Sequence, residues 1–381
     1  MTPDPIDLTQ KLIRCASVTP EDDGAIPLLA DILAGAGFRV ERVDRGGICN
    51  LFARWDAPEP GPVLGFNGHT DVVPVGDRDA WRHDPFGAEI HGDVLFGRGA
   101  TDMKSGVASF VAAACRIIAA QPAKGAIVIT ITGDEEGSAT DGTAAILDWM
   151  AAAGEGMDAC LVGEPTCPET MGEMIKVGRR GSMTAYLEAR GHQGHSAYPH
   201  RAKNPLPVLV RCLDRLAAHS LDDGTAHFDP STLAITTIDT GNPANNVIPA
   251  EARATVNIRF NDAHNSTGLK DWIGAEMAAA SDGTGVALSA RFQVSGESFL
   301  TPPGAFSDMV AAAVHGETGV KPVLSTSGGT SDARFIRAIC PVVEFGLVGK
   351  TMHQVDECVP VGQITQLTEI YARIIHDFLQ Q

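Results

Sequence analysis

The sequence has few features of a membrane, secreted or nucleic-acid-binding protein. None of its apolar runs reaches the roughly 20 residues of a bilayer-spanning helix, and the best candidate, Val107 to Ala120, is interrupted by Arg116. The first ten residues, MTPDPIDLTQ, are acidic and lack the apolar stretch of a signal peptide. Basic residues are scarce, since 29 Lys and Arg against 47 Asp and Glu give a net charge of −18. Such a charge disfavours nucleic acid or an anionic membrane as the main partner.

Cysteine pairs with the spacing of metal or redox motifs are also absent. The eight cysteines are scattered, with no CxxC pair, so the pattern indicates neither a disulfide framework nor a zinc finger. We therefore expect a cytoplasmic protein with reduced thiols. The 381 residues are too many for one ordinary core and favour two domains. A content of 44% hydrophobic and 20% charged residues is typical of folded domains rather than disordered tails.

The order of strand-like and helix-like runs predicts an α/β protein with an inserted domain. In the first part, apolar strands such as Ala126–Thr132 alternate with helices such as Lys104–Ala120, which is typical of α/β layers. The middle of the chain contains two strand–helix–strand units in series, which indicates a small α+β sandwich of the ferredoxin-like kind. After these units, alternating helices and strands return. The predicted domains are 1–179 with 293–381, and the insert 180–292. Among the expected helices are Thr140–Ala153, Pro205–Ala218, Ser331–Ala338 and Val361–Leu379.

Acidic residues and histidines lie in four glycine-containing loops beside predicted strands. Ligands bind outside the carboxyl ends of the strands in α/β sheets, so these loops bring their side chains to one crevice. The side chains are His69, Asp102, Glu135, Glu136 and Glu164. Histidine and carboxylates without cysteine suit zinc, or another divalent ion, in an open catalytic site. His353, after the predicted strand 341–345, is a second imidazole that would allow two metals to share a carboxylate.

Simpler roles are open to each of these residues. A single histidine in a chain with 12 is more often a surface or capping residue than a metal ligand. Asp102 could cap the Ala-rich helix, and Glu135 and Glu136 could form a solvated turn. Because four such loops occur together, we favour the metal site. Other chemistries fit poorly, since there is no GxSxG elbow and the Gly97-x-Gly99 pair has Asp102 where a third glycine should stand.

Nine segments together resemble the M20 dinuclear-zinc peptidases and deacylases. They cover nearly the whole chain and read NGHTDVVPV (67–75), GRGATDMK (97–104), TGDEEGSATDGT (132–143), GEPT (163–166), VGRRGS (177–182), GHQGHSAYPH (191–200), NNVIPAE (245–251), GGTSDARF (328–335) and MHQVDE (352–357). His-x-Asp and Asp-Glu-Glu are shared by the wider family. ATDGT, GRRGS and GGTSD are similar to its branch that removes succinyl groups from diaminopimelate. The resemblance implies a zinc-peptidase-like three-layer catalytic domain with an inserted α+β lid and dimerisation domain.

The resemblance also implies a ligand set for two zinc ions per subunit, with cobalt as a substitute. His69 and Glu164 would bind one ion. Glu136 and His353 would bind the other, and Asp102 would bridge the two.

Three further residues receive catalytic roles from the resemblance. Asp71 would hold the ring of His69, and Glu135 would be the general base. His195 would reach into the active site of the partner subunit of a homodimer. Two simpler roles stay open, because Glu135 could be a third metal ligand and His195 could be an ordinary turn residue.

The implied reaction is hydrolysis of N-succinyl-L,L-2,6-diaminopimelate to succinate and L,L-2,6-diaminopimelate, in bacterial lysine synthesis. Such a carboxylate-rich substrate needs cationic contacts, and we expect Arg179 and Arg259 to bind its carboxylates because guanidinium groups pair with them bidentately. Polar contacts are expected from Tyr198, Asn245, Gly329 and Thr330. One departure from the family pattern is Gly349, where relatives are expected to carry Asn, so a substrate contact is missing or supplied differently there.

Two other functions fit the same residues. The first is a sister deacylase that acts on N-acetylornithine or on a dipeptide. The second is a non-catalytic binding protein on the same scaffold, which would be expected to lack one or more metal ligands. All the candidate ligands are intact in this sequence, which favours an enzyme.

Overall fold

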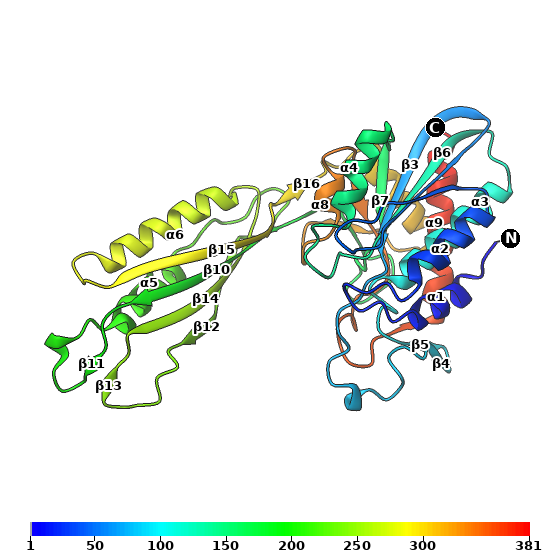
Figure 1. The fold of residues 1–381 in the computed structure, drawn as a ribbon. Helices are drawn as coiled ribbons and strands as arrows, with labels where there is room; N and C mark the ends of the chain where they lie inside the picture. Colours follow the sequence, from blue (N-terminus) through cyan, green and yellow to red (C-terminus); the bar gives the residue numbers. More distant parts are fainter. Residues whose placement is uncertain (1) are drawn as a thin grey trace. The chain divides into compact units, whose positions relative to one another are not determined.

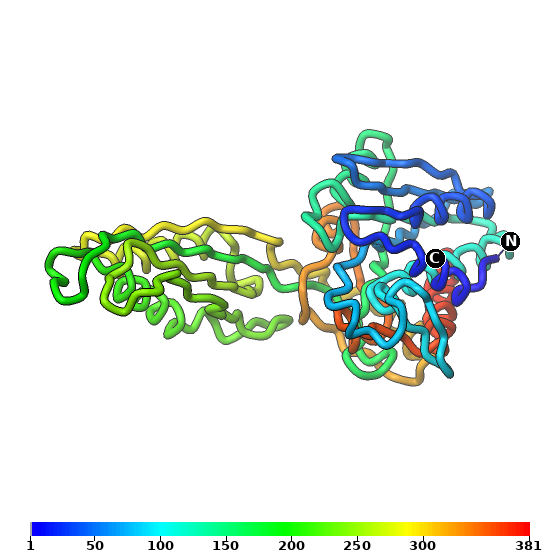
Figure 2. Tube along the Cα trace, turned by 60° about the horizontal axis from the view of Figure 1, so that its bottom comes forward, coloured from blue at the N-terminus to red at the C-terminus, as the bar shows by residue number. Residues whose placement is uncertain are grey.

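The computed structural model describes residues 2–381 and divides the chain into two compact units. The large unit contains Met1–Val177, Thr301–Ser325 and Ser331–Gln381. The small unit contains Gly178–Leu300 and Thr326–Thr330. Figure 1 shows both units, and Figure 2 shows that the first and last segments of the chain belong to the same one, the large unit.

The small unit is longer than the insert expected from the sequence, 180–292. It extends to Leu300 because strand β15 continues to Gly296 and because β16 (Phe299–Leu300) pairs with β9 (Gly178–Arg179). The short segment Thr326–Thr330 also belongs to it. Within this unit the Thr326 hydroxyl donates to a main-chain carbonyl at 2.6 Å, and the Arg179 guanidinium donates to the Gly329 carbonyl at 3.1 Å.

An eight-stranded sheet forms the centre of the large unit. Its strand order is β1-β2-β6-β3-β7-β18-β8-β17. The four central strands, β6, β3, β7 and β18, run parallel, so their carboxyl ends lie at one edge of the sheet. The strands of this sheet are β1 (Arg39–Arg42), β2 (Leu51–Asp56), β3 (Glu59–His69), β6 (Lys124–Thr132), β7 (Ala159–Val162), β8 (Met174–Lys176), β17 (Val323–Ser325) and β18 (Val342–Glu344).

Helices cover both faces of this sheet (Figure 1). One face carries α1 (Pro5–Arg14), α2 (Ala25–Gly35), α3 (Lys104–Ala119), α7 (Ala305–Thr318) and α9 (Val361–Leu379). The other carries α4 (Thr143–Ala153) and the short α8 (Ala333–Ile336). Alternate residues of β2 serve the two faces, since Leu51 belongs to the core of the first face and the Phe52 ring lies 4.9 Å from Trp149 of α4. The predicted three-layer α/β fold is confirmed. Among the described helices, none has the length and apolar composition needed to cross a membrane.

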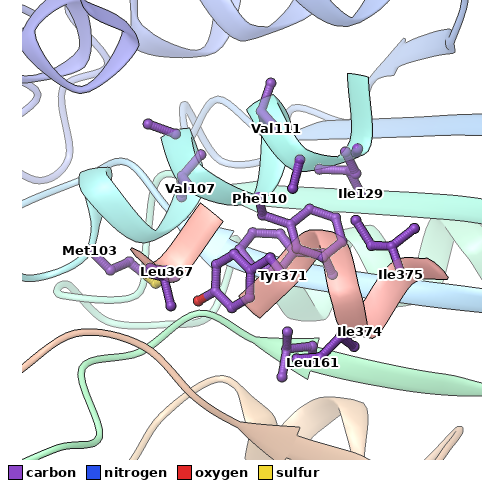
Figure 3. Packing of buried hydrophobic residues seen from close by; sticks show 14 of the residues in the cluster. Met103, Val107, Phe110, Val111, Ile129, Leu161, Leu367, Tyr371, Ile374 and Ile375 are labelled. Carbon is purple, nitrogen blue, oxygen red and sulfur yellow. The ribbon is translucent and has the colours of Figure 1, made fainter. Parts of the chain in front are cut away.

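The main hydrophobic core lies between α3, α9 and the sheet (Figure 3). The ring of Phe110 stacks on Phe66 with centroids 4.0 Å apart, and Tyr371 of α9 meets both rings at an edge. The Tyr371 hydroxyl donates a 2.7 Å hydrogen bond to a main-chain carbonyl, so its buried polar atom is satisfied. Met103 is fully buried in the same core and directly follows Asp102. The core therefore anchors the loop that carries Asp102.

Two predicted helices are shorter in the structure. α4 begins at Thr143 rather than at 140, because the Asp134 carboxylate accepts from the main-chain N–H groups of Thr140 and Asp141 and holds them in a loop. α8 has only four residues. A small three-stranded sheet of the large unit was not predicted, nor were α1, α2, β1 and β2. That sheet consists of β4 (Glu89–His91), β5 (Val94–Phe96) and β19 (Cys358–Pro360).

The small unit is an antiparallel sheet with two helices on one face. The sheet order is β12-β14-β10-β15, and the chain order β10-α5-β12-β14-α6-β15 is the expected pair of strand–helix–strand units. Alternate residues of β10, such as Met183 and Leu187, are buried in the core shared with the helices. A short ribbon of β11 (Gly194–His195) and β13 (Val247–Ile248) completes the unit. The main elements are β10 (Gly181–Arg190), α5 (Pro205–Ala218), β12 (Thr232–Asp239), β14 (Glu251–Phe260), α6 (Ser266–Ser281) and β15 (Ala287–Gly296).

Candidate metal centre

Six of the expected side chains converge at the edge where the parallel strands of the large unit end. They come from the end of β3, the loop before α3, the loop after β6, the loop after β7 and the loop between β18 and β19. In chain order they are His69, Asp102, Glu135, Glu136, Glu164 and His353. The structure thus brings together residues that lie as far apart as 284 positions in the sequence (353 − 69).

Asp102 lies between two histidines. Its Oδ1 is 3.3 Å from His69 Nε2, and its Oδ2 is 3.3 Å from His353 Nε2. Each imidazole nitrogen also has a second carboxylate beside it. Glu164 Oε1 lies 3.7 Å from His69 Nε2, and Glu136 Oε1 lies 2.8 Å from His353 Nε2. The result is two His–Glu pairs that share one carboxylate.

The chemistry of these atoms fits a pair of divalent ions. Among the described residues, His69 Nε2 and Asp102 Oδ1 are buried atoms without a hydrogen-bond partner, although they face each other. Leaving such a group unsatisfied costs about 1–3 kcal/mol. Zinc binds imidazole nitrogen and carboxylate oxygen at about 2.0–2.2 Å, so ligand atoms on a tetrahedral ion lie about 3.3 Å apart. The separation of the two unsatisfied atoms matches that spacing.

The electrostatics of the centre also call for cations. Burial opposes the charged form of His69, yet the adjoining carboxylates, Asp102 foremost, raise its pKa well above the usual value. Contacts with Asp102 and Glu136 raise the pKa of His353 to about 10. Burial and neighbouring carboxylates raise the pKa of Glu135 well above the usual value. Bound cations favour the opposite forms, ionised carboxylates and neutral imidazoles, because they take the place of the protons.

Asp71 orients the loops around His69. The Nδ1 of His69 donates to the main-chain carbonyl of Asp71 at 2.8 Å, which leaves Nε2 to face Asp102. The carboxylate of Asp71 lies 3.6 Å from the same ring nitrogen. It accepts instead from the main-chain N–H groups of Glu135 at 3.2 Å and Glu136 at 3.0 Å. The main chain of Asp71 therefore holds the ring, and its side chain fixes the turn that carries the two glutamates.

A buried ion pair that the sequence analysis missed supports Asp102. Arg98 Nη1 lies 2.7 Å from Glu357 Oε2, and both side chains are buried. The other oxygen of Glu357 accepts from the main-chain N–H groups of Thr101 at 2.9 Å and Asp102 at 3.1 Å. The pair thus fixes the loop through its backbone. Both residues lie in segments that resemble the family, GRGATDMK and MHQVDE. Their place in these segments was the sequence signal that could have identified them.

A second missed network joins three of the resembling segments. The Thr143 hydroxyl donates to Asp332 Oδ2 at 2.7 Å, and the Asn67 side-chain amide donates to the Thr143 hydroxyl at 3.1 Å. All three side chains are buried. They connect the strand that ends in His69 to the first turn of α4 and to the residue before α8, so the network holds the backbone around the candidate centre.

Close backbone packing fixes the loop that carries Glu164. A Cβ at Gly106 of α3 would lie 2.6 Å from the carbonyl oxygen of Gly163. Only glycine lets the helix approach the loop so closely. A larger residue at 106 would displace Gly163 and, with it, the adjacent Glu164.

His195, Tyr198 and Asn245 lie in the small unit, near the β11–β13 ribbon. The His195 side chain is exposed, and its Nδ1 accepts from the main-chain N–H of Ala197 at 3.0 Å. In the neutral ring the proton is therefore on Nε2, which is left as a donor. The rings of His195 and Tyr198 lie 5.7 Å apart. The main-chain N–H of Ser196 donates to the Asn246 carbonyl at 2.9 Å, which brings the Asn245 loop beside His195.

The two arginines expected to bind carboxylates also lie in the small unit. Arg179 is buried and donates to the carbonyl of Gly329, the residue before Thr330. Arg259 Nε donates to a side-chain oxygen on the same strand at 3.3 Å. Burial, and then the charge of nearby Arg180, lower the pKa of Arg259. The guanidinium groups of Arg180 and Arg259 are close enough to repel each other, so their surroundings favour a bound anion.

Comparisons with known proteins identify the family of the chain. The model of the peptidase family M20/M25/M40 matches residues 65–377. The succinyl-diaminopimelate desuccinylase of Ruegeria pomeroyi is 65% identical over 378 residues, which cover 99% of this chain and 100% of that protein. The enzyme of the same name from Dinoroseobacter shibae is 66% identical, with 98% of this chain and 99% of that protein covered.

Solved structures share the fold at much lower sequence identity. An M20 family metallo-carboxypeptidase from Sulfolobus solfataricus has a TM-score of 0.80 at 14% identity and covers 100% of both chains. A dinuclear metal-binding M20 peptidase from Bacillus subtilis has a TM-score of 0.72 at 16% identity, covering 99% of this chain and 98% of that one. With the match of the family model and the relatives at 65% identity, these results show that the chain belongs to the peptidase family M20/M25/M40.

Proposed function

We propose that this metal-dependent hydrolase converts N-succinyl-L,L-2,6-diaminopimelate to succinate and L,L-2,6-diaminopimelate in bacterial lysine synthesis. The observation that carries the proposal is the Asp102 carboxylate, which lies 3.3 Å from each of two histidines in a chain 65% identical to desuccinylases. A biosynthetic step of this kind takes place in the cytoplasm, which we propose as its location.

The metal site that we propose holds two zinc ions, with cobalt as a substitute. His69 and Glu164 would hold one ion, and Glu136 and His353 the other. Asp102 would hold both. When bound, such ions lower the pKa of a water molecule and polarise the carbonyl of the amide.

Glu135 is the proposed general base. Its backbone is fixed by the Asp71 carboxylate, and its side chain lies among the metal ligands. In this role the carboxylate of Glu135 takes a proton from the attacking water and passes it to the nitrogen of the leaving amine. The alternative is a third metal ligand, because ligand atoms of His69, Glu135 and Glu164 all lie within 4.8 Å of one another.

A substrate comparison tests the proposed reaction. We expect the zinc-loaded enzyme to hydrolyse N-succinyl-L,L-2,6-diaminopimelate with a higher kcat/KM than N-acetylornithine or a dipeptide, because the first substrate presents the carboxylates that the guanidinium groups can bind. The measurement is kcat/KM for each substrate under one set of conditions. Faster turnover of N-acetylornithine would assign the chain to a sister deacylase. No turnover of any substrate by the metal-loaded protein would favour a binding protein.

Arg259 is a proposed contact to a substrate carboxylate, and its removal should have a measurable effect on kcat/KM. Arg259→Ala is expected to lower kcat/KM by about 10- to 100-fold, because a hydrogen bond to a charged group contributes about 1.5–3 kcal/mol. Metal content should not change, since Arg259 is not a metal ligand. Arg190→Ala is a matched control, because Arg190 lies in the same sheet and forms only an exposed ion pair with Glu188. Equal activity of the two variants would remove Arg259 from the substrate site.

Arg179 also has a structural role, so a variant must distinguish the loss of this role from the loss of substrate binding. Its guanidinium donates to the Gly329 carbonyl and so also holds the loop that contains Thr330. Arg179→Lys retains the charge but loses the planar fork of donors. We propose that Arg179, Tyr198, Asn245, Gly329 and Thr330 contact the substrate together with Arg259.

A further inference from the structure

A second group of metal-ligand side chains lies outside the centre described above. It is formed by His83, Glu89 and His91, whose ligand atoms all lie within 4.8 Å of one another. Glu89 and His91 are two positions apart on β4, so both side chains project from the same face of the small three-stranded sheet. His83 reaches them from the segment before β4. None of the three residues belongs to the Asp102 centre.

The distances within this group match the spacing of ligands on one ion. Glu89 Oε2 lies 2.8 Å from His91 Nε2 and 3.4 Å from His83 Nδ1. A tetrahedral zinc ion with bonds of about 2.0–2.1 Å holds its ligand atoms about 3.3 Å apart. The ligand atoms of the two imidazoles also lie within 4.8 Å of each other, so adjustment of the side chains would let one ion contact all three residues.

Packing holds both imidazoles in place before an ion arrives. The rings of His83 and His91 stack with centroids 3.9 Å apart and an angle of 28° between their planes. The ring of Phe96 on β5 lies 4.5 Å from His83 and 6.1 Å from His91. The two imidazole rings are thus in contact with each other and with Phe96, while one nitrogen of each imidazole is directed at Glu89. Rings fixed in this way lose little conformational freedom on binding.

The charges around the group are compatible with a cation. Glu89 supplies a negative charge, and its carboxylate faces one nitrogen of each imidazole. The positive side chain of Arg82, the residue before His83, is already compensated. Its Nε lies 2.7 Å from Asp356 Oδ2, and its main-chain N–H donates to Asp356 Oδ1 at 2.8 Å.

We propose that His83, Glu89 and His91 bind a zinc ion in addition to the ions of the Asp102 centre. Two nitrogen ligands and one carboxylate form a set that zinc accepts, and water completes the four-coordinate geometry. The ion would clip the segment before β4 to the β4–β5 hairpin. It is therefore expected to stabilise the fold without taking part in hydrolysis.

Zinc stoichiometry tests this site. The untagged protein is first loaded at the Asp102 centre, dialysed, and titrated with Zn²⁺ by isothermal calorimetry, with elemental analysis as a second count. We expect the wild type to bind one more zinc ion per chain than a His83→Ala/His91→Ala double variant. We also expect the added ion to raise the Tm of the wild type only. Glu89→Gln should weaken the binding of the same ion, while hydrolytic activity is unchanged in all these variants.

His376→Ala is the matched control. His376 forms a similar exposed pair with a carboxylate, 2.9 Å from Asp377, but lacks a third ligand among the described residues. It should keep the additional zinc ion. The proposal is overturned if the wild type and the double variant bind equal amounts of zinc. If the double variant does not fold, Glu89→Gln decides, and the proposal is overturned if that variant binds the additional zinc ion as tightly as the wild type.

Discussion

Glu135→Gln is expected to lower kcat by about 10²–10⁴, the usual contribution of a general base, while the chain still binds two metal ions. Glutamine keeps the shape of the side chain and removes its ability to accept the proton of the attacking water. The Asp71 carboxylate holds residue 135 by its main-chain N–H, so the loop should keep its conformation in the variant. The measurements are steady-state kcat and metal content on the same preparation.

The adjacent glutamate provides the matched comparison. Glu136 Oε1 lies 2.8 Å from His353 Nε2, and Glu136 is a proposed ligand, so Glu136→Gln should lose metal as well as activity. If Glu135→Gln also loses metal, then Glu135 is a third ligand and a different group transfers the proton. Normal activity of Glu135→Gln with full metal would exclude both roles.

His195→Ala is expected to lower kcat by about 10²–10³, the usual loss for removal of one donor to an oxyanion. The structure supports a donor role, because His195 Nδ1 accepts from the Ala197 main chain and leaves the proton on Nε2. Metal content should not change, because His195 is exposed and is not a proposed ligand, and the homodimer expected from the sequence should still form. His192→Ala, an exposed histidine three residues earlier, is the control and should keep its activity.

Mixed dimers test whether His195 serves the partner subunit. If His195 completes the site of its partner in the expected homodimer, co-expression of His195→Ala and Glu135→Gln chains should restore activity, because each hybrid dimer then has one site with both residues intact. Random pairing of equal amounts makes half of the dimers hybrids, so about a quarter of the wild-type activity is expected. No recovery in isolated hybrid dimers would show that His195 acts within its own chain.

Short-range signals account for the parts of the fold and site that sequence reasoning predicted. α5 has the predicted bounds because Asn204 caps its first turn and Pro205 occupies its first position. The sequence indicated the candidate ligands because each lies at the end of a strand or in a loop beside one. Asp102 and His353 are 251 positions apart (353 − 102), yet the convergence of parallel strands at one edge brings them together.

Long-range contacts explain what sequence reasoning did not predict. The pair of Arg98 and Glu357 joins residues 259 positions apart, and no local pattern distinguishes it from two surface charges. The cluster of His83, Glu89 and His91 depends on a three-stranded sheet whose strands have three residues each and give no periodic signal. Their proximity becomes visible only when the chain has folded.

The way the chain enters and leaves the small unit has a consequence for how this architecture arose. Arg179 at the entrance pairs with Phe299 at the exit, and in the large unit the main-chain N–H of Thr301 donates to the Val177 carbonyl at 2.7 Å. The two places where the large unit is interrupted, at Val177 and Thr301, are therefore hydrogen-bonded to each other. The segment Gly178–Leu300, the main part of the small unit, is thus joined to the large unit through two adjacent strands, an arrangement that would let a gene for the large unit acquire this segment in one event.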